Sequence, residues 1–216
     1  MQLRGRMARA PALSMTGVGA ALVFLGLVAL ELAHGPFGAE RDLLAELRRG
    51  GDPAMLEGPD WLTPFMKDIT ALGGSPILTL LTVLLVGFLA FRRDWARMGL
   101  VILVIAGQSI VIDVLKGLFD RARPDVAPHL AHVASPSFPS GHASSSASAY
   151  LLVVLLLAQN FKDAVLRRYV FAAAIILALT VGMSRVFLGV HYPSDVLAGW
   201  SFGLAWTIGW FALARR

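Results

Sequence analysis

Three clusters of polar residues interrupt the apolar second half of the chain, and their side chains are of types that carry out chemistry. The clusters are Lys116 with Arg123-Pro124, the segment Pro139-Ser140-Gly141-His142, and Ser184-Arg185 with His191 and Asp195. They supply three cations, two histidines and one carboxylate. Phosphoryl transfer requires cations on the non-bridging oxygens, because its transition state spreads charge over them, and it requires a nucleophile and an acid. The clusters are therefore suited to act on a phosphoryl group.

The third cluster has the spacing of a histidine nucleophile with a carboxylate partner. The chain is broken between His191 and Asp195 by a Pro-Ser pair, and we expect the serine, Ser194, to be the N-cap of the helix that follows. Asp195 then lies in the first turn, where it can reach back to His191. A carboxylate that holds one ring nitrogen leaves the other free to attack phosphorus. We therefore interpret His191 as the nucleophile and His142 as the free acid.

The second cluster has the pattern of a helix start that binds an anion. Ser140 is a natural N-cap, and a helix N-terminus beside Gly141 presents backbone N–H groups to a ligand. Each cluster alone also has a structural explanation. The cations of the first could reach lipid headgroups, the helix start could be a plain cap, and the third could be an interfacial salt bridge. The phosphoryl interpretation therefore depends on the three clusters lying together, and nothing in them requires a metal ion or another cofactor.

Taken together, the clusters resemble the signature of the type 2 phosphatidic acid phosphatase superfamily, which also contains bacterial acid phosphatases and vanadium haloperoxidases. That signature reads Lys, six residues, Arg-Pro; then Pro-Ser-Gly-His; then Ser-Arg, five residues, His, three residues, Asp. The chain matches it at every position and in the same order. The matching region, 116–195, is the expected catalytic part of the chain.

The resemblance implies a role for each matching residue. His191 would carry a transient phosphohistidine, Asp195 would fix its tautomer, and His142 would protonate the leaving oxygen and then activate water. The phosphoryl oxygens would be bound by Lys116, Arg123, Ser140, Gly141 and Arg185. No metal site is implied.

Six apolar segments must position these residues. The chain has 216 residues, of which 56% are hydrophobic and 15% charged, and it has no cysteine, which excludes disulfides and thiolate metal sites. A helix that spans a bilayer needs about 20 mostly apolar residues, and backbone groups that face lipid must be paired within it. The candidate spans are 13–33, 76–91, 98–119, 143–159, 169–188 and 196–214, the second beginning as early as residue 69. We predict one all-α membrane domain over 1–216, a six-transmembrane-helix bundle.

Basic residues set the expected orientation of this bundle. They lie in small groups between apolar runs, which indicates membrane topology rather than nucleic-acid binding. With the N-terminus in the cytoplasm, that side holds 11 of the 19 Lys and Arg residues: Arg4, Arg6, Arg9, Arg92, Arg93, Arg97, Lys162, Arg167, Arg168, Arg215 and Arg216. The positive-inside rule therefore predicts that both termini are cytoplasmic and that the site faces the extracytoplasmic side of a bacterial inner membrane.

The connection 34–68 contains two segments with helical spacing. The first has Leu43, Leu44 and Leu47, and the second has Trp61 and Phe65 on one face. Two interpretations stay open. The segments are either interfacial helices of an extracytoplasmic connection, which guard lipid access to the site, or parts of an ordinary packed loop.

Three further polar residues have weaker patterns. His129 and His132 form an H-x-x-H pair, but two histidines without a third ligand make a weak metal site, and we expect them at the rim of the site. Asp113 lies one turn before Lys116 on the same helix face. We expect it to be a structural partner of Lys116 or Arg123.

Packing explains the remaining polar residues of the spans. Glu31 lies near the end of the first span and is expected at the membrane interface. Small residues allow helices to approach closely in a bilayer. The fourth span is therefore expected to pack through its serines, Ser144, Ser145, Ser146 and Ser148.

The sequence predicts an integral-membrane lipid phosphatase that hydrolyses a phosphomonoester or a pyrophosphate, because an embedded site suits an amphiphilic substrate. Candidate substrates are phosphatidic acid, phosphatidylglycerophosphate, a polyprenyl pyrophosphate and a lipid A phosphate. A lipid-to-lipid phosphotransferase would use the same residues, and a vanadate-dependent peroxidase shares the motifs. A transporter of anions or lipids, or a lipid-binding protein, is an alternative of another class, although no helix shows the paired Gly/Pro interruptions typical of transporters.

Overall fold

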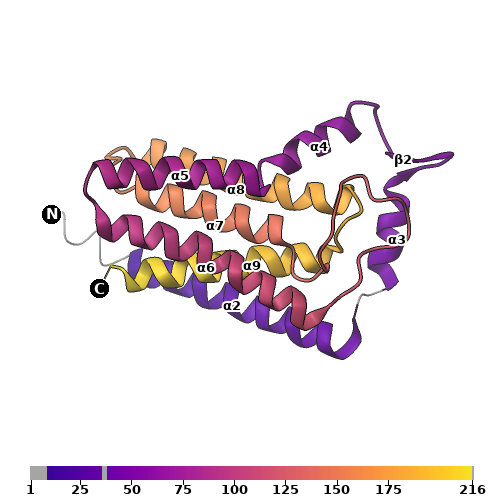
Figure 1. Ribbon diagram of the computed structural model, residues 1–216, viewed down its shortest axis with the longest axis horizontal. Helices are drawn as coiled ribbons and strands as arrows, with labels where there is room; N and C mark the ends of the chain where they lie inside the picture. The colour runs from indigo at the N-terminus through magenta and orange to yellow at the C-terminus, as the bar shows by residue number, and fades with distance from the viewer. Residues whose placement is uncertain (1–8, 36–37, 216) are drawn as a thin grey trace.

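The computed structural model describes residues 9–35 and 38–215, and its long helices lie side by side in one bundle (Figure 1). In chain order the helices are α2 (Arg9–His34), α3 (Gly38–Glu46), α4 (Leu62–Ala71), α5 (Ser75–Phe91), α6 (Trp95–Phe119), α7 (Gly141–Leu157), α8 (Ala164–Phe187) and α9 (Pro193–Leu213). Two short strands, β1 (Arg48–Arg49) and β2 (Asp52–Leu56), form an antiparallel hairpin between α3 and α4. The predicted helical fold is confirmed, with this hairpin as an addition.

The length and the apolar composition of the helices identify the fold as a bundle that spans a membrane. Within the described residues, five helical stretches are long and apolar enough to cross a bilayer, with α4 and α5 counted as the single stretch Leu62–Phe91. The other apolar helix, α7, has only 17 residues. Large apolar side chains face outwards, among them Phe91 (88% exposed) and Leu118 (74% exposed), as a surface in contact with lipid requires. The chain is an integral membrane protein, and six crossings remain a prediction.

Local caps and packing decide where the helices begin. Asp163 accepts a hydrogen bond from the N–H of Val165, so α8 starts five residues before the predicted position 169. We expected the second span to begin as early as residue 69. The candidate span Leu62–Phe91 includes this residue, but the helix is broken at 72–74, so residue 69 belongs to α4 and α5 begins at Ser75. A Cβ atom on Gly73 would lie 2.3 Å from Cγ1 of Val181, so the break brings this backbone directly against α8.

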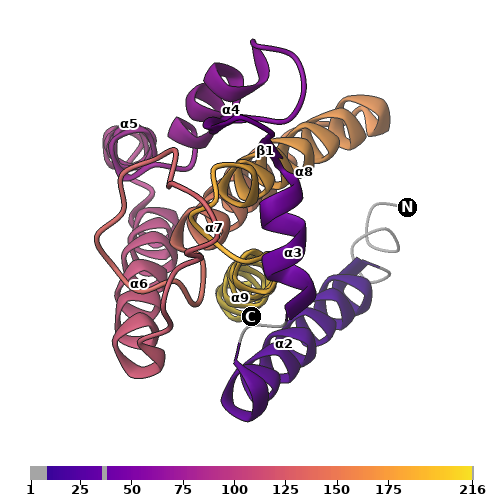
Figure 2. The same ribbon diagram turned by 90° about the vertical axis from the view of Figure 1, so that its right-hand side faces the viewer.

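Helices α7 and α9 pack closely at the centre of the bundle (Figure 2). A Cβ atom on Gly203 would lie 2.6 Å from the carbonyl oxygen of Ser144, so a larger residue would force the helices apart. The Ser148 hydroxyl donates to the Gly203 carbonyl, and Ser146 is also fully buried. The predicted packing surface is thus confirmed for three serines, but wrong for Ser145, which lines a cavity.

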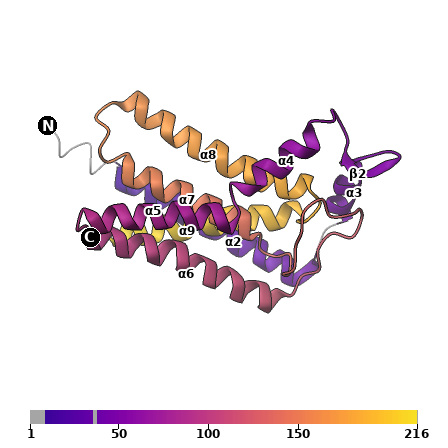
Figure 3. The same ribbon diagram turned by 45° about the horizontal axis from the view of Figure 1, so that its top comes forward.

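The connection 34–68 folds into α3, the hairpin and α4, which together cover one end of the bundle (Figure 3). Both segments with helical spacing are helices. Leu44 of α3 is completely buried, and α4 packs against α8. Trp61, just before α4, is 61% exposed and its ring lies edge-on to that of Phe65. A position of these helices at a membrane interface stays a prediction.

The two ends of the bundle differ in character. The start of α2 and the end of α9 lie at one end, and the α6–α7 loop lies at the other, together with α3 and the hairpin (Figure 1). The apolar core includes Leu100, Val104, Leu152 and Phe211. Buried charged residues gather instead around the α6–α7 loop, and they include Lys116, Arg121, Arg185 and Asp195. A membrane protein keeps buried charges mainly for function, so this end holds the candidate site.

Candidate active site

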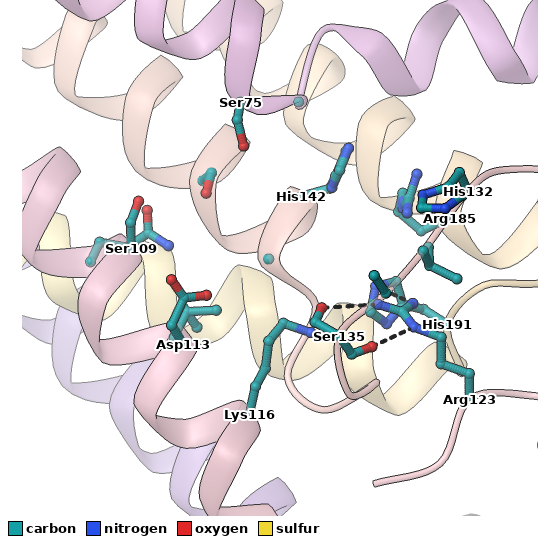
Figure 4. Close-up of a pocket in the computed structure, with 17 residues that line it drawn as sticks. Ser75, Ser109, Asp113, Lys116, Arg123, His132, Ser135, His142, Arg185 and His191 are labelled. Atoms are coloured by element: carbon teal, nitrogen blue, oxygen red, sulfur yellow. Dashed lines mark hydrogen bonds between the residues drawn. The ribbon is translucent and has the colours of Figure 1, made fainter. Parts of the chain in front are cut away.

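A cavity of about 310 Å³ lies between α5, α6, α7 and α8, beside the α6–α7 loop (Figure 4). Six of the eight residues selected from the sequence line it, namely Lys116, Arg123, Gly141, His142, Arg185 and His191. The other two, Ser140 and Asp195, are completely buried next to the lining residues Gly141 and His191. The structure therefore brings together three clusters that are far apart in the sequence.

The His191 ring is held between a carboxylate and a guanidinium. Its Nδ1 lies 3.3 Å from Oδ2 of Asp195, and its Nε2 lies 3.2 Å from Nη1 of Arg123. Because a guanidinium only donates hydrogen bonds, Nε2 must be the acceptor, and the ring proton is on Nδ1, facing Asp195. Burial lowers the pKa of His191 to about 3, against the opposing effect of Asp195. At neutral pH the ring is therefore uncharged and has a lone pair on Nε2.

The start of α9 fixes the carboxylate that faces this ring. The expectation that Ser194 caps α9 is wrong. Proline suits the first helical position, so α9 begins at Pro193 and its N-cap is Tyr192. Asp195 reaches back as predicted, and its Oδ2 accepts the N–H of Tyr192 at 2.9 Å and the hydroxyl of Ser137 at 2.5 Å. Three donors thus converge on one carboxylate oxygen and hold the imidazole in a single orientation.

Arg121 binds the other carboxylate oxygen of Asp195. Its Nη1 lies 2.6 Å from Oδ1, and both side chains are buried. Two glutamates also contact this guanidinium, Glu31 of α2 at 3.2 Å and Glu40 of α3 at 3.4 Å. The ring of Tyr192 lies under it at 4.5 Å. Only 11% of the Glu31 side chain is exposed, because it pairs with the buried Arg121, and its expected level at the membrane interface stays a prediction.

The three cations of the cavity are bound to neutral acceptors. Lys116 and Arg123 both donate to carbonyl oxygens of the segment 135–137, and Arg185 donates to the hydroxyl of Thr70 in α4 at 2.8 Å. Among the residues that the structure describes, none of the three cations forms an ion pair with a carboxylate. Nε of Arg185 is buried and has no hydrogen-bonding partner there. The cavity therefore has uncompensated positive charge that suits an anion.

Asp113 lines the cavity on the α6 side, across from His191 (Figure 4). We expected it to be a structural partner of Lys116 or Arg123. Its charge acts on Lys116, but no direct contact joins it to either cation in the described ranges. Lys116 turns towards the carbonyl oxygens at 136–137, and Arg123 turns towards His191. Within residues 9–35 and 38–215, the Asp113 carboxylate has neither an ion pair nor a hydrogen bond.

The N-terminus of α7 forms a further side of the cavity. Ser140 is its N-cap, as predicted, and its side-chain oxygen accepts a hydrogen bond from the N–H of Ala143. His142 follows in the first turn and lines the cavity. The described part of the chain forms no hydrogen bond to the His142 ring. Its ring is therefore free to exchange a proton with a ligand, as an acid or a base.

The H-x-x-H pair does not form a metal centre in the described part of the chain. The Nε2 atom of His129 lies 2.7 Å from the carbonyl oxygen of Pro124, while His132 lines the cavity. The described residues contain no group of three or more His, Asp or Glu side chains that could hold a metal ion. The predicted position at the rim is confirmed for His132.

Sequence reasoning missed three residues that contact the site: Thr70, Arg121 and Ser137. Each acts through a partner that is distant in the sequence, so no spacing rule selects it. The sequence offered a reason to select Arg121, because it is a third cation in the first cluster, between Lys116 and Arg123. The N-terminal charges Arg4 and Arg6 and the C-terminal Arg216, which entered the orientation argument, lie outside the described residues.

Comparisons with known proteins extend beyond the motifs. The family model of the PAP2 superfamily matches residues 97–216. Phosphatidylglycerophosphatase B of Bacillus subtilis is 38% identical over 154 residues, which are 70% of this chain and 74% of that protein. Lipid A 1-phosphatase of Rhizobium etli is 37% identical over 115 residues, which are 49% of this chain and 43% of that protein. A crystal structure of a transmembrane PAP2-type phosphatidylglycerolphosphate phosphatase from Bacillus subtilis has a TM-score of 0.79 and 33% identity, and covers 93% of this chain and 96% of its own.

Proposed function

Because the chain belongs to the PAP2 superfamily, we propose that its cavity hydrolyses a lipid phosphate through a phosphohistidine, without a metal ion. The relatives are lipid phosphatases by name, and the chain is a lipid phosphate hydrolase. One observation carries the proposed mechanism. The neutral ring of His191 has its Nε2 lone pair at a cavity that also contains three cations, none of which is paired with a carboxylate of the described residues.

In the first step, Nε2 of His191 attacks phosphorus. The bond from phosphorus to the lipid oxygen breaks, and that oxygen takes a proton from the imidazolium form of His142, which the negative charge of the bound phosphate stabilises. The Arg123 guanidinium, which donates to Nε2 in the structure, moves onto a phosphoryl oxygen when the substrate binds. The proton on Nδ1 stays with the ring, and Asp195 stabilises the positive charge that the phosphorylated imidazole acquires.

In the second step, a water molecule attacks the phosphorus of the phosphohistidine. His142, which has given up its proton, accepts one from this water. The bond from phosphorus to Nε2 breaks, inorganic phosphate leaves, and His191 returns to its neutral form. No oxidant, reductant or co-reactant other than water is consumed.

The phosphoryl oxygens are bound by groups from three helices and one loop. Lys116, Arg123 and Arg185 supply positive charge, and the start of α7 at Ser140 and Gly141 supplies backbone N–H groups. These donors stabilise the charge on the transition state. Phosphoryl transfer depends more on this electrostatic stabilisation than on covalent catalysis. The arrangement supports cleavage rather than transport, because both histidines lie at the anion-binding cavity.

The substrate in this proposal is a lipid phosphate presented at the extracytoplasmic face of a bacterial inner membrane. The candidates remain phosphatidic acid, phosphatidylglycerophosphate, a polyprenyl pyrophosphate and a lipid A phosphate. A cavity in the side of a membrane bundle suits a substrate whose tail stays in the bilayer while its phosphate reaches the cations.

The proposal is tested by measuring phosphate release from purified lipid phosphates in the presence of EDTA. We expect activity that chelation leaves intact, inhibition by vanadate, and a loss of several orders of magnitude in His191→Ala. His129→Ala is the matched control, because its ring contacts Pro124 outside the cavity and its loss should leave most of the activity. Activity that EDTA abolishes and a metal restores would contradict metal independence. Near wild-type activity of His191→Ala would show that His191 is not the nucleophile.

A further inference from the structure

Helix α3 lies at the same end of the bundle as the site and runs across the long helices (Figures 1 and 2). Its residue Leu44 is completely buried, in an apolar cluster that includes Ala143 of α7, Val186 of α8 and Val196 of α9. Glu40 precedes Leu44 by four residues, so both side chains lie on the same face of α3. The helix therefore presents one apolar and one acidic side chain to the helices that carry the site.

The Glu40 carboxylate binds the first turn of α9. Its Oε1 accepts the N–H of Ser194 at 2.6 Å, and its Oε2 accepts the Ser194 hydroxyl at 3.1 Å. The first N–H groups of a helix have no partner within the helix, so a negatively charged acceptor from another element stabilises them. Ser194 directly precedes Asp195, the residue that faces His191. Glu40 thus holds the backbone next to this carboxylate.

Glu40 also shares the guanidinium that binds Asp195. Nη2 of Arg121 lies 3.4 Å from Oε2 of Glu40, while Nη1 lies 2.6 Å from Oδ1 of Asp195. Both oxygens of Glu40 accept N–H groups, as those of an ionised carboxylate do. Only 11% of its side chain is exposed, so its charge is weakly screened. Arg121 alone would offset much of the charge of Asp195, and Glu40 restores negative charge beside the pair.

Negative charge at this place matters at one stage of the proposed reaction. When Nε2 of His191 bonds to phosphorus, the ring keeps its proton on Nδ1 and becomes positive. Nearby negative charge lowers the energy of that state, whereas the uncharged ring of the free enzyme gains little from it. An interaction that is stronger in the transition state than in the ground state raises kcat and hardly changes substrate binding.

We propose that Glu40 is a positioning residue for the reaction, which acts on His191 through Ser194, Arg121 and Asp195. The inference rests on the proposed function and adds to it a residue outside 97–216, the region that the family model matches. Glu40 does not line the cavity, so it does not bind the phosphate. It aligns the start of α9, and its charge allows Asp195 to stabilise the phosphorylated ring.

The test compares the wild type with Glu40→Ala and Glu40→Gln on phosphatidic acid and phosphatidylglycerophosphate in mixed micelles. We expect Glu40→Ala to lower kcat by about ten- to a hundredfold, the effect of losing hydrogen bonds to a charged group, while KM changes by less than about twofold. Glu40→Gln keeps an acceptor for the Ser194 N–H but not the charge, so its kcat should fall less. Glu46→Ala is the matched control with wild-type kcat, because Glu46 is an exposed residue of the same helix.

Inhibition separates this role from a merely structural one. Vanadate resembles the transition state at the nucleophile, whereas inorganic phosphate binds as the product of the reaction. We expect the inhibition constant of vanadate to rise about as much as kcat falls, and that of phosphate to change by less than about twofold. A merely structural role would lower the unfolding temperature and the active fraction, and would leave both inhibition constants unchanged.

Wild-type kcat in Glu40→Ala would overturn the positioning role, and so would constants for vanadate and phosphate that change equally. If Glu40→Ala does not fold, the nearly isosteric Glu40→Gln decides, and wild-type kcat in that variant would overturn the role of the charge. The proposed function stands after any of these results, provided that the wild type releases phosphate and vanadate inhibits it. A wild type that releases no phosphate from either lipid, or that vanadate does not inhibit, would contradict the proposed function itself.

Discussion

His191 combines two properties that a free histidine does not have together. Burial keeps the ring uncharged, and Asp195 keeps the ring proton on Nδ1, so that Nε2 is a permanent acceptor at neutral pH. The carboxylate is itself shared, because Arg121 binds its other oxygen at 2.6 Å. This sharing limits how strongly Asp195 can draw a proton onto the ring. The site therefore favours the form of the imidazole that can act as a nucleophile.

Burial of His191 makes the stability of the protein dependent on pH. The unfolded ring takes up a proton below its usual pKa of about 6.5, whereas the folded ring does so only near its lowered pKa of about 3. The unfolded state thus binds more protons between these values, and the free energy of unfolding falls by up to about 1.4 kcal/mol for each pH unit below the usual pKa. His191→Asn, which cannot take up this proton, should lose less stability on acidification than the wild type. Thermal unfolding in detergent between about pH 4 and pH 7 measures the two slopes, and parallel slopes would contradict the prediction.

The sequence identified those site residues whose expected roles follow from their spacing along the chain. His142, His191 and Asp195 were selected because short-range intervals relate them to a helix start or to each other. Arg121 and Ser137 were not, because they act on Asp195 across more than fifty residues of chain. Such partners follow from how the helices and loops pack, and a single sequence contains no interval that encodes that packing.

At the scale of the elements, α9 fixes the position of the α7 N-terminus. A Cβ atom on Gly199 would lie 2.5 Å from the carbonyl oxygen of Ser140, the N-cap residue at the end of α7 that borders the cavity. The sequence predicted that the serines of this helix mediate close packing, but it did not indicate the glycines of the partner helix. Helix boundaries were likewise predicted less well than helix existence, because caps such as Asp163 lie outside the apolar runs.

Gly199→Ala is expected to damage both stability and activity. The new methyl group must push α9 away from α7 or move the backbone at Ser140, and overpacking of this kind costs about 1–3 kcal/mol. Because Ser140 is next to Gly141 in the cavity wall, we expect kcat to fall more than the loss of folded protein explains. Gly209→Ala is the matched control on the same helix, since its Cβ would meet nothing within 4 Å. Unfolding temperature and kcat of purified protein measure both effects, and equal behaviour of the two variants would refute the argument.

Helix α4, which begins within the connection 34–68 and ends beyond it, also contributes to the site. Thr70 accepts a hydrogen bond from Arg185 at 2.8 Å, so a helix before the second long span positions a cation on α8. From the sequence, the segment that forms α4 is interpreted either as an interfacial helix that guards lipid access or as part of a packed loop, and neither interpretation includes a contact with Arg185. A threonine near the end of an amphipathic segment gives no sign of its partner, because that partner is 115 residues away.

At the scale of the whole molecule, buried charges connect the two halves of the chain. Glu31 of α2 and Glu40 of α3 reach Arg121, which in turn reaches Asp195 of α9. The first half, which lacks the motifs, thus completes the electrostatic surroundings of Asp195 and His191. Breaking a buried ion pair by removing one partner leaves the others uncompensated. The network explains why the site requires more than the motif region 116–195.

The uneven distribution of basic residues between the two ends of the bundle predicts its orientation in the membrane. The loop residues at the end with the termini are strongly basic, with Arg92, Arg93 and Lys162 among them, while the site and the hairpin lie at the opposite end (Figure 1). The positive-inside rule then places the basic end in the cytoplasm. Because the sequence contains no cysteine, a single introduced cysteine is the only target for a maleimide. Glu57→Cys, beyond the hairpin, should react with a membrane-impermeant maleimide in spheroplasts, and Lys162→Cys should react only after the membrane is permeabilised.

Both positions are exposed, so protection of Lys162→Cys in spheroplasts would reflect the membrane rather than burial in the protein. The unmodified chain serves as the blank. The reverse pattern, with Lys162→Cys labelled from outside and Glu57→Cys protected, would place the cavity on the cytoplasmic face. The hydrolysis chemistry would be unaffected by that result, because it depends only on the geometry around His191, but the enzyme would then act on lipid phosphates of the inner leaflet. Labelling thus decides which leaflet supplies the substrate, independently of any activity measurement.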